Sequence, residues 1–399
     1  MNIVILAAGL GKRMHSDTPK VLHRLAGRPL LSHVIETAKS LSPEVVCVVY
    51  GSGGEAVRET LGENGAIWVK QQPQLGTGHA VMQAVPHLDE RWPTLVLCGD
   101  VPLIRAETLR QLIDGAGNGL GLLTATLDDP RGYGRIVRSG KRVVRIVEER
   151  DATARQRAIR EINTGIVVAP TKKLKGWLAL LKNDNVQEEY YLTDIVALAV
   201  KHRIPVTAAQ AGAVWETLGV NSRGQLAELE RIYQLNIAKA LMERGVALAD
   251  PRRCAVRGSL VCGRDVAIDV NCVFEGDVQL GDGVSIGANC VLKRVVIAAG
   301  TRVEPFCHLE DADIGENCSI GPYMRIRPGT DIPGLYGMLW HIFQNGWEDK
   351  EFIRQRVYGM DDVRKEIDKW TPEEVERVSG VPGEQLKRVA EMFAKDKPS

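Results

Sequence analysis

The sequence has almost no net charge and no long hydrophobic run. Lysine and arginine number 51, and aspartate and glutamate number 50, so the 399-residue chain carries a formal charge of +1 at pH 7. Without a global field to attract nucleic acid or an anionic membrane, any phosphate ligand must be held by local groups. No apolar stretch approaches the roughly 20 residues of a membrane span, and the first residues are not typical of a signal peptide. We therefore expect a cytoplasmic protein that partners neither nucleic acid nor a membrane.

The sequence also lacks any close Cys-x-x-Cys pair. Six of the eight cysteines lie between residues 254 and 318, a clustering that metal sites can show. Four of the six occupy the same small position of a sequence repeat described below, so packing explains them better than a metal or redox role. Cys47 and Cys98 lie on predicted strands, and the same interpretation applies. In the cytoplasm these thiols stay reduced.

A phosphate-binding loop is predicted at the start of the chain. Residues 2–6 form an apolar strand, and residues 7–9 (Ala-Ala-Gly) form a turn in which a ligand can approach the backbone closely. Arg13 can hold a phosphate in its planar fork, and Lys20 adds a point charge. The spacing fits neither a Walker loop nor a dinucleotide fingerprint. An ordinary turn rich in alanine and glycine is the alternative, but it leaves the two cations unexplained.

The periodicity of the sequence predicts four segments in a chain long enough for two or three domains. In residues 1–221, short apolar strands alternate with helices, which predicts an α/β domain with a doubly wound, mostly parallel sheet. Residues 222–250 have helical spacing and form a connecting helix. In residues 251–330 a large apolar side chain recurs every six residues, with two steps of five, and this hexapeptide repeat predicts a three-sided parallel β-helix. Residues 331–399 are predicted to be a helical tail.

Two polar segments of the first domain are candidate nucleotide contacts. Gln71 and Thr77 flank a glycine turn, and their amide and hydroxyl groups can recognise a pyrimidine edge; a helix cap by Thr77 is the alternative. Asp100 follows a strand, where open α/β sheets bind their ligands. A carboxylate beside several phosphates needs a cation, and Mg²⁺ suits its oxygen atoms, although a helix-capping aspartate has the same pattern. Residues 132–135, 147–149 and 161–165 carry polar groups suited to a sugar.

The order of these motifs over residues 1 to about 330 resembles the bacterial family of bifunctional N-acetylglucosamine-1-phosphate uridyltransferase/glucosamine-1-phosphate N-acetyltransferases. The resemblance implies a homotrimer with a left-handed β-helix that makes UDP-N-acetylglucosamine from UTP and N-acetylglucosamine-1-phosphate for peptidoglycan and lipopolysaccharide. It implies these roles: Leu6, Ala7, Ala8 and Gly9 on the nucleotide; Arg13 and Lys20 as catalytic groups on the phosphates; Gln71, Gly76 and Thr77 at uracil; Gly134, Glu148 and Asn163 at the sugar; Asp100 and Asn221 as Mg²⁺ ligands, Asn221 also touching substrate; and Arg327 on the amino sugar phosphate of the second activity.

The resemblance places that second activity, acetyl transfer from acetyl-CoA, on further β-helix coils at a trimer junction. Here the six-residue period stops near residue 330, so we expect acetyl transfer to be lost through truncation. Residues 331–399 instead resemble an internal fragment of molybdopterin oxidoreductases of the formate dehydrogenase and periplasmic nitrate reductase type, without their Cys-rich cluster. The sequence does not distinguish a natural fusion from an artificial joining. His341, the only histidine of the tail, is interpreted as packing.

Two classes of function stay open at this point. The first is an active uridylyltransferase on a shortened β-helix, and the second is a non-catalytic or unstable fusion that only binds a nucleotide sugar. The intact set of Arg13, Lys20, Asp100 and Asn221 favours the first. One departure from the family is Cys98, where members often have tyrosine, and we expect it to loosen the sugar site slightly.

Overall fold

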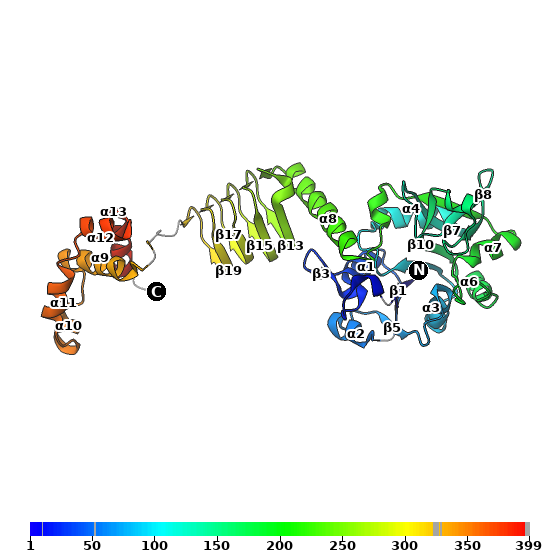
Figure 1. Ribbon diagram of the computed structural model, residues 1–399, viewed down its shortest axis with the longest axis horizontal. Helices are drawn as coiled ribbons and strands as arrows, with labels where there is room; N and C mark the ends of the chain where they lie inside the picture. The colour runs from blue at the N-terminus through cyan, green and yellow to red at the C-terminus, as the bar shows by residue number, and fades with distance from the viewer. Residues whose placement is uncertain (10, 52, 322–326, 328, 396–399) are drawn as a thin grey trace. The chain divides into compact units, whose positions relative to one another are not determined.

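The computed structural model describes residues 1–9, 11–51, 53–321, 327 and 329–395 (Figure 1). The chain divides into two compact units, Met1–Ile320 and Gly321–Ser399. Within the described ranges, no helix combines the length and the apolar character needed to cross a membrane.

A nine-stranded sheet organises the first part of the chain, in the order β11-β7-β10-β6-β1-β4-β5, with β8 and β9 attached through β10. The strands are β1 (Asn2–Ala7), β4 (Val45–Tyr50), β5 (Ile67–Lys70), β6 (Pro93–Cys98), β7 (Leu120–Thr126), β8 (Arg135–Ser139), β9 (Arg142–Val147), β10 (Glu161–Pro170) and β11 (Val206–Gln210). β1 runs parallel to β4 and β6, whereas β10 runs antiparallel to β6 and β7. The sheet is mixed because the β8–β9 hairpin returns the chain to β10 without a crossover helix.

Helices cover both faces of this sheet. Val4 packs in one apolar cluster with α3, α6 and α7, and its neighbours Ile3 and Ile5 pack in the other with α1, α2 and α4, as expected when side chains alternate along a strand. The helices are α1 (Leu30–Lys39), α2 (Glu55–Leu61), α3 (Thr77–Ala84), α4 (Ala106–Ala116), α5 (Ala154–Arg157), α6 (Thr171–Leu178) and α7 (Asp194–Lys201). The predicted α/β layering is confirmed.

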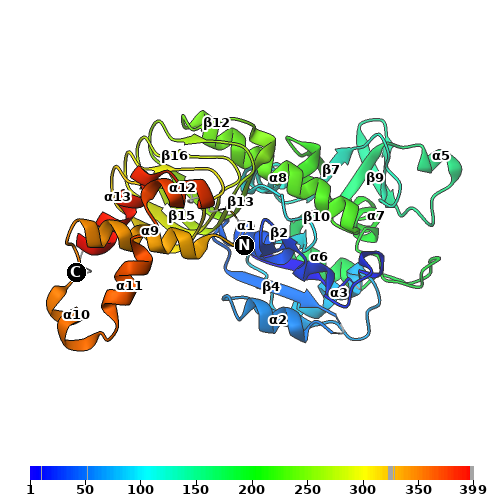
Figure 2. The same ribbon diagram turned by 60° about the vertical axis from the view of Figure 1, so that its left-hand side comes forward.

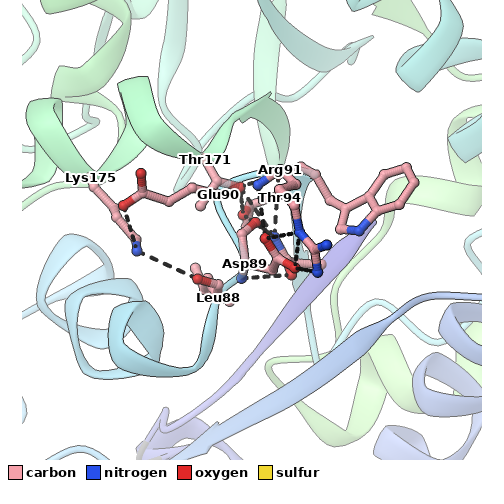
Figure 3. A network of polar contacts seen from close by, with 9 residues as sticks. Leu88, Asp89, Glu90, Arg91, Thr94, Thr171 and Lys175 are labelled. Atoms are coloured by element: carbon pink, nitrogen blue, oxygen red, sulfur yellow. Dashed lines mark hydrogen bonds and ion pairs between the residues drawn. The ribbon is translucent and has the colours of Figure 1, made fainter.

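A polar network joins the starting ends of β1 and β6 to α6 (Figure 3). The buried Asn2 donates through Nδ2 to the Asp89 carbonyl at 2.8 Å and to Thr171 Oγ1 at 3.2 Å, and its Oδ1 accepts the Asp89 N–H at 3.2 Å. Thr171 Oγ1 also lies 2.6 Å from Thr94 Oγ1. Since parallel strands begin at one edge of the sheet and end at the other, this network lies opposite the ends of β1 and β6.

We expect Asn2→Ala to destabilise the central sheet by about 1–3 kcal/mol, because it leaves buried partners without hydrogen bonds. Hydrogen exchange of the β1 and β6 amides measures this local free energy of opening. Asn118→Ala, at an exposed position, is the control and should change it by less than about 0.5 kcal/mol. Equal protection in both variants would show that the Asn2 network contributes nothing.

A long helix connects the sheet to a stack of parallel strands. Helix α8 (Arg223–Glu243) begins at Ser222, whose side chain accepts the Gln225 N–H. Beside it, β2 (Arg24–Leu25) and β3 (Arg28–Pro29) form a hairpin in which the Ala26 N–H donates to Glu230 Oε2 at 2.6 Å. A helix is therefore present in the predicted connecting segment 222–250, but it ends at Glu243, and residues 247–248 form the short strand β12.

The stack consists of two parallel sheets (Figure 1). One has β13 (Cys254–Cys262), β15 (Cys272–Leu280), β17 (Val291–Ile297) and β19 (His308–Ile314); the other has β12 (Ala247–Leu248), β14 (Ala267–Ile268), β16 (Ser285–Ile286), β18 (Arg302–Val303) and β20 (Ser319–Ile320). Cys254 lies opposite Cys272, and Val291 lies opposite His308 in a coil that contains a step of five. Three hexapeptides therefore make one full coil, and a step of five makes the coil correspondingly shorter.

The large apolar side chains of the repeat fill the interior of the stack, as Phe274 and Leu292 do at 0% exposure. Burial falls off in the last described coil, where Ile314 and Ile320 are only half-buried. The last inward position expected from the repeat, Ile326, lies outside the described residues.

The cysteines of the stack pack as predicted. Cys254, Cys272, Cys290 and Cys307 are all buried and form one column, since the strand registers place each opposite the next. Cys318 is half-buried and belongs to another column, where it lies opposite Thr301. The Thr301 hydroxyl accepts the Cys318 N–H at 2.9 Å. Burial raises the pKa of the Cys254 thiol to about 12, so this thiol stays protonated at neutral pH.

The second unit is helical, with α9 packed beside α12 and α13 (Figure 2). Its helices are α9 (Asp331–Gln344), α10 (Lys350–Arg356), α11 (Met360–Ile367), α12 (Pro372–Ser379) and α13 (Gly383–Lys395). Thr371 caps α12 by accepting the Glu374 N–H, and Gly380 ends it at φ 77°. His341 is 6% exposed, and burial lowers its pKa, which fits packing.

Candidate active site

The end of β1 forms one wall of a cavity of about 410 Å³. Because β6 pairs with β1, the loops that follow both strands meet at this edge of the sheet. Predicted residues that line the cavity are Leu6, Ala7, Ala8, Gly9, Lys20, Gln71, Gly76, Thr77 and Asp100. Gly11 has φ +60°, and a Cβ there would lie 2.8 Å from Lys20 Cβ, so the turn needs glycine at this point.

Lys20 joins two groups that lie far apart in the sequence. Its Nζ lies 2.5 Å from Asp100 Oδ2 and 3.1 Å from Asn221 Oδ1. The Lys20 and Asp100 side chains are 12% and 19% exposed. Asp100 follows β6, Asn221 precedes α8, and the Val220 N–H donates to the Asp100 carbonyl at 2.9 Å, which holds the two segments together. A carboxylate oxygen and an amide oxygen thus converge on one cationic position at the cavity wall.

Gln71 is fixed in the floor of the same cavity at 2% exposure. Its Nε2 donates to the Gly76 carbonyl at 2.9 Å and lies 3.1 Å from His79 Nδ1. Burial lowers the pKa of His79, which favours the neutral ring as hydrogen-bond acceptor. With its amide nitrogen directed at Gly76 and His79, the oxygen of Gln71 is left as the group that can bind a ligand.

A second cavity of about 210 Å³ brings together the three predicted sugar residues, Gly134, Glu148 and Asn163. A Cβ at Gly134 would lie 3.0 Å from Ile146 Cγ2, so the tight approach favours glycine. The Thr193 hydroxyl donates to Glu148 Oε1 at 2.9 Å, and burial raises the pKa of Glu148. Asn163 Oδ1 is buried with no hydrogen-bond partner among the residues described, as expected of an acceptor reserved for a ligand.

The two cavities share Leu6, Thr77 and Cys98 in their walls, so they adjoin. Cys47 and Cys98 were both predicted to pack in the core. Cys47 does so, at 0% exposure, whereas Cys98 also lines both cavities. Cys98 follows the buried part of β6 and faces the place where the cavities meet. Burial and the Asp100 charge raise the pKa of its thiol to about 12, so it is an uncharged wall and not a nucleophile.

Three predicted site residues line neither cavity: Asn221, which contacts Lys20 at the cavity wall, Arg13 and Arg327. Arg13 is exposed and lines neither of them. Arg327 belongs to the second unit, where its Nη1 donates to the carbonyls of Arg377 at 2.8 Å and Val378 at 3.3 Å. This contact of the guanidinium with backbone carbonyls differs from the phosphate contact that the resemblance implies.

Sequence reasoning missed two residues of the site. Gln74 lines the first cavity and donates to the Ala8 carbonyl, and its place in a glutamine-rich segment was an available signal. Thr193 holds Glu148, but a threonine before a helix usually indicates a cap. Only the tertiary fold brings Thr193 to a residue 45 positions away.

The fold and this site define a nucleotidyltransferase. Residues 3–245 match the family model of the MobA-like NTP transferase domain, and residues 256–334 match that of the GMPPB C-terminal domain. The chain is 61% identical over 331 residues to the bifunctional protein GlmU of Herminiimonas arsenicoxydans. It is 61% identical over 334 residues to the bifunctional protein GlmU of Ralstonia pickettii (strain 12J). Each alignment covers 83% of this chain and 73% of the relative. The chain belongs to the GlmU family.

Among solved structures, the inositol-1-phosphate CTP transferase from T. maritima aligns with 58% of this chain and 96% of its own, at 20% identity and a TM-score of 0.46.

Proposed function

We propose that this chain transfers a uridylyl group from UTP to N-acetylglucosamine-1-phosphate, forming UDP-N-acetylglucosamine and pyrophosphate. The observation that carries the proposal is the convergence of Lys20, Asp100 and Asn221 beside two adjoining cavities. Membership of the GlmU family supports it. The larger cavity would take the nucleotide and the smaller one the sugar, so that the α-phosphorus and the acceptor phosphate meet near Lys20.

The chemistry asks mainly for charge neutralisation and alignment. A phosphate oxygen of the sugar phosphate attacks the α-phosphorus, and pyrophosphate leaves from the opposite side. Both reactants are anions, so a fixed cation and the accessible backbone N–H groups at residues 7–9 would lower the barrier more than a general base could. Lys20 supplies the cation inside the cavity, and Arg13, which is exposed, would reach the phosphates from the rim.

Asp100 and Asn221 fit a hard divalent cation, and we propose Mg²⁺. Their oxygen atoms both face Lys20 Nζ, so the donor set already accommodates positive charge. Within the described ranges, no group of three or more histidine, cysteine or acidic side chains could hold a metal; substrate phosphates would therefore complete the coordination. When bound, Mg²⁺ neutralises charge on the transferring phosphoryl group.

The direct test is the release of pyrophosphate from UTP and N-acetylglucosamine-1-phosphate with Mg²⁺, set against a parallel reaction with EDTA. Release that needs both substrates and stops with EDTA supports the proposal. Binding of the substrates without release would favour the alternative of a fusion that only binds nucleotide sugar.

We expect UTP to be used at least about tenfold better than CTP, since one buried hydrogen-bond pattern would be mismatched. The free oxygen of Gln71 can accept the N3–H of uracil, and cytosine has no hydrogen there. Competition between UTP and CTP measures the ratio of kcat/KM values. Gln71→Ala should reduce the preference to a few-fold, whereas equal use of both nucleotides by the unmodified chain would exclude a uracil site here.

We expect no acetyl transfer from acetyl-CoA to glucosamine-1-phosphate. The last described strand of the stack is β20, and Arg327 is engaged by carbonyl groups of α12. Free CoA thiol can be followed while the uridylyl step serves as the positive control on the same preparation. A CoA release rate near that of the uridylyl step would mean that a partner chain or the tail supplies the missing site.

The remaining inferences concern organisation. We propose a nucleotidyltransferase domain at 1–221, a connecting helix at 222–250, a shortened left-handed β-helix at 251–330 and a helical tail at 331–399. Trimer formation through the β-helix and kinship of the tail with molybdopterin oxidoreductases stay proposals that rest on the sequence resemblance alone.

A further inference from the structure

A third cavity lies outside the active site, between α8 and the first coils of the stack, and has a volume of about 430 Å³. Four arginines line it, Arg231 on α8, Arg252 and Arg253 in the turn before β13, and Arg257 on β13, together with one acidic residue, Glu230. The lining therefore carries a net charge of +3, whereas the whole chain carries only +1. Positive charge is concentrated here beyond what the composition of the chain would give.

Most of this charge is not neutralised by the protein. Arg257 pairs with Glu275 at 2.7 Å. Arg253 donates to the neutral Asn271 Oδ1 at 2.8 Å, which orients its guanidinium. Among the described residues, no carboxylate forms an ion pair with the guanidinium groups of Arg231, Arg252 or Arg253. Three cations thus share one hollow without an ion pair, an arrangement that an anion would stabilise.

We propose that this cavity binds a small molecule carrying two or more phosphate groups, at a site separate from the active site. The volume lies within the range of small-molecule sites, about 300–1,000 Å³. Guanidinium groups match phosphate oxygens in a bidentate manner, so arginine favours this class over a carboxylate metabolite of single charge. The proposal goes beyond the uridylyl transfer and does not rest on it.

Two segments that contact this cavity, the β2–β3 hairpin and α8, also lie close in the sequence to Lys20 and Asn221 of the proposed active site. Glu230 accepts the Ala26 N–H at 2.6 Å, and a Cβ on Gly27 would lie 3.2 Å from Arg257 Cβ, so the β2–β3 hairpin touches the cavity wall. That hairpin follows Lys20 by a few residues, and α8 begins shortly after Asn221. An anion drawn to the arginines would change the field on Glu230 and so reach both segments.

Isothermal titration calorimetry with inorganic triphosphate tests the site without any turnover. Triphosphate is also expected to bind at Lys20. We therefore compare the number and strength of the triphosphate binding events between variants that all keep the active site unchanged. We expect the double variant Arg231→Gln, Arg253→Gln to lose one of two binding events, or to weaken it at least tenfold. Arg302→Gln, an arginine on β18 that is 68% exposed and outside the cavity, is the matched control and should bind as the parent does.

Arg252→Gln is a second variant for the case that the double variant fails to fold. The Arg252 guanidinium makes no hydrogen bond within the described ranges, so we expect its replacement to leave the fold unchanged. It should weaken the same event several-fold. Hydrogen exchange of the β2–β3 amides should slow on addition of triphosphate more in the parent than in Arg252→Gln. Identical titrations for parent, Arg252→Gln and Arg302→Gln would overturn the proposal. A change of sedimentation between parent and Arg252→Gln with unchanged triphosphate binding would overturn it too, and would assign the arginines to an acidic protein surface.

Discussion

Asp100→Ala should lower the rate of pyrophosphate release by about 10³-fold or more and leave the fold intact. Single preorganised groups that stabilise transition-state charge contribute about 10²–10³-fold, and this carboxylate also accepts from Lys20 and would be the charged ligand of the proposed Mg²⁺. Its side chain lines the cavity and belongs to neither apolar cluster of the sheet, so its removal takes no packing contact from the core. Steady-state rates at saturating substrates, with Mg²⁺ varied over a wide range, measure the effect.

The control for this variant is Asp114→Ala, an exposed carboxylate on α4 in the same domain. Its turnover should match that of the parent. Asp100→Asn should fall between parent and Asp100→Ala, because it keeps an oxygen donor and loses the charge. Turnover by Asp100→Ala within a few-fold of the parent, at any Mg²⁺ concentration, would remove Asp100 from the proposed metal site.

Lys20→Ala should reduce kcat by about 10²–10³-fold and change the KM for UTP only a few-fold. Only interactions that strengthen in the transition state raise kcat, and negative charge shifts toward the leaving pyrophosphate as the reaction proceeds. Lys20 lines the cavity proposed for the nucleotide, where that charge would develop. Initial rates over a UTP series separate the two parameters.

Lys39→Ala, an exposed lysine at the end of α1, is the matched control and should leave both parameters unchanged. Lys20→Arg should recover little activity, since the larger planar group has to fit between Asp100 and Asn221. A loss confined to KM would place Lys20 in ground-state binding of UTP.

Local patterns in the sequence predicted the layers of this protein well. The six-residue spacing fixed the coils because each large side chain has to stack on the one before, and the register of Cys254 on Cys272 follows from three such steps. The strand at residues 94–97 and the functional aspartate just beyond its end, Asp100, were likewise expected from a buried apolar run. The antiparallel β10 was not predicted, since the direction of a strand depends on how the chain returns to the sheet and not on its own residues.

Contacts between distant segments decide the rest of the site. Lys20 and Asn221 are separated by 201 positions, and no local pattern places their side chains 3.1 Å apart. The resemblance to a family supplied the pairing of Asp100 with Asn221, and the bond of each to Lys20 emerged only from the structure. Arg327 shows the converse, because a residue that matches the family by type has its guanidinium on a backbone carbonyl of α12.

The half-buried last described coil has a thermodynamic consequence. A stack of coils behaves as a one-dimensional chain of units coupled only to their neighbours, so a coil with less buried apolar surface opens at a lower free energy than the interior. Ile314 and Ile320 in that coil retain partial solvent exposure, while Phe274 and Leu292 are fully enclosed. Unfolding should therefore begin as fraying from β19 and β20 and travel toward β13, with heat or denaturant giving a broad, multistep transition. The nine-stranded sheet is separated from these strands by several coils and by α8. It would therefore stay folded, and unfold as one cooperative unit, until the opening of the coils reaches α8.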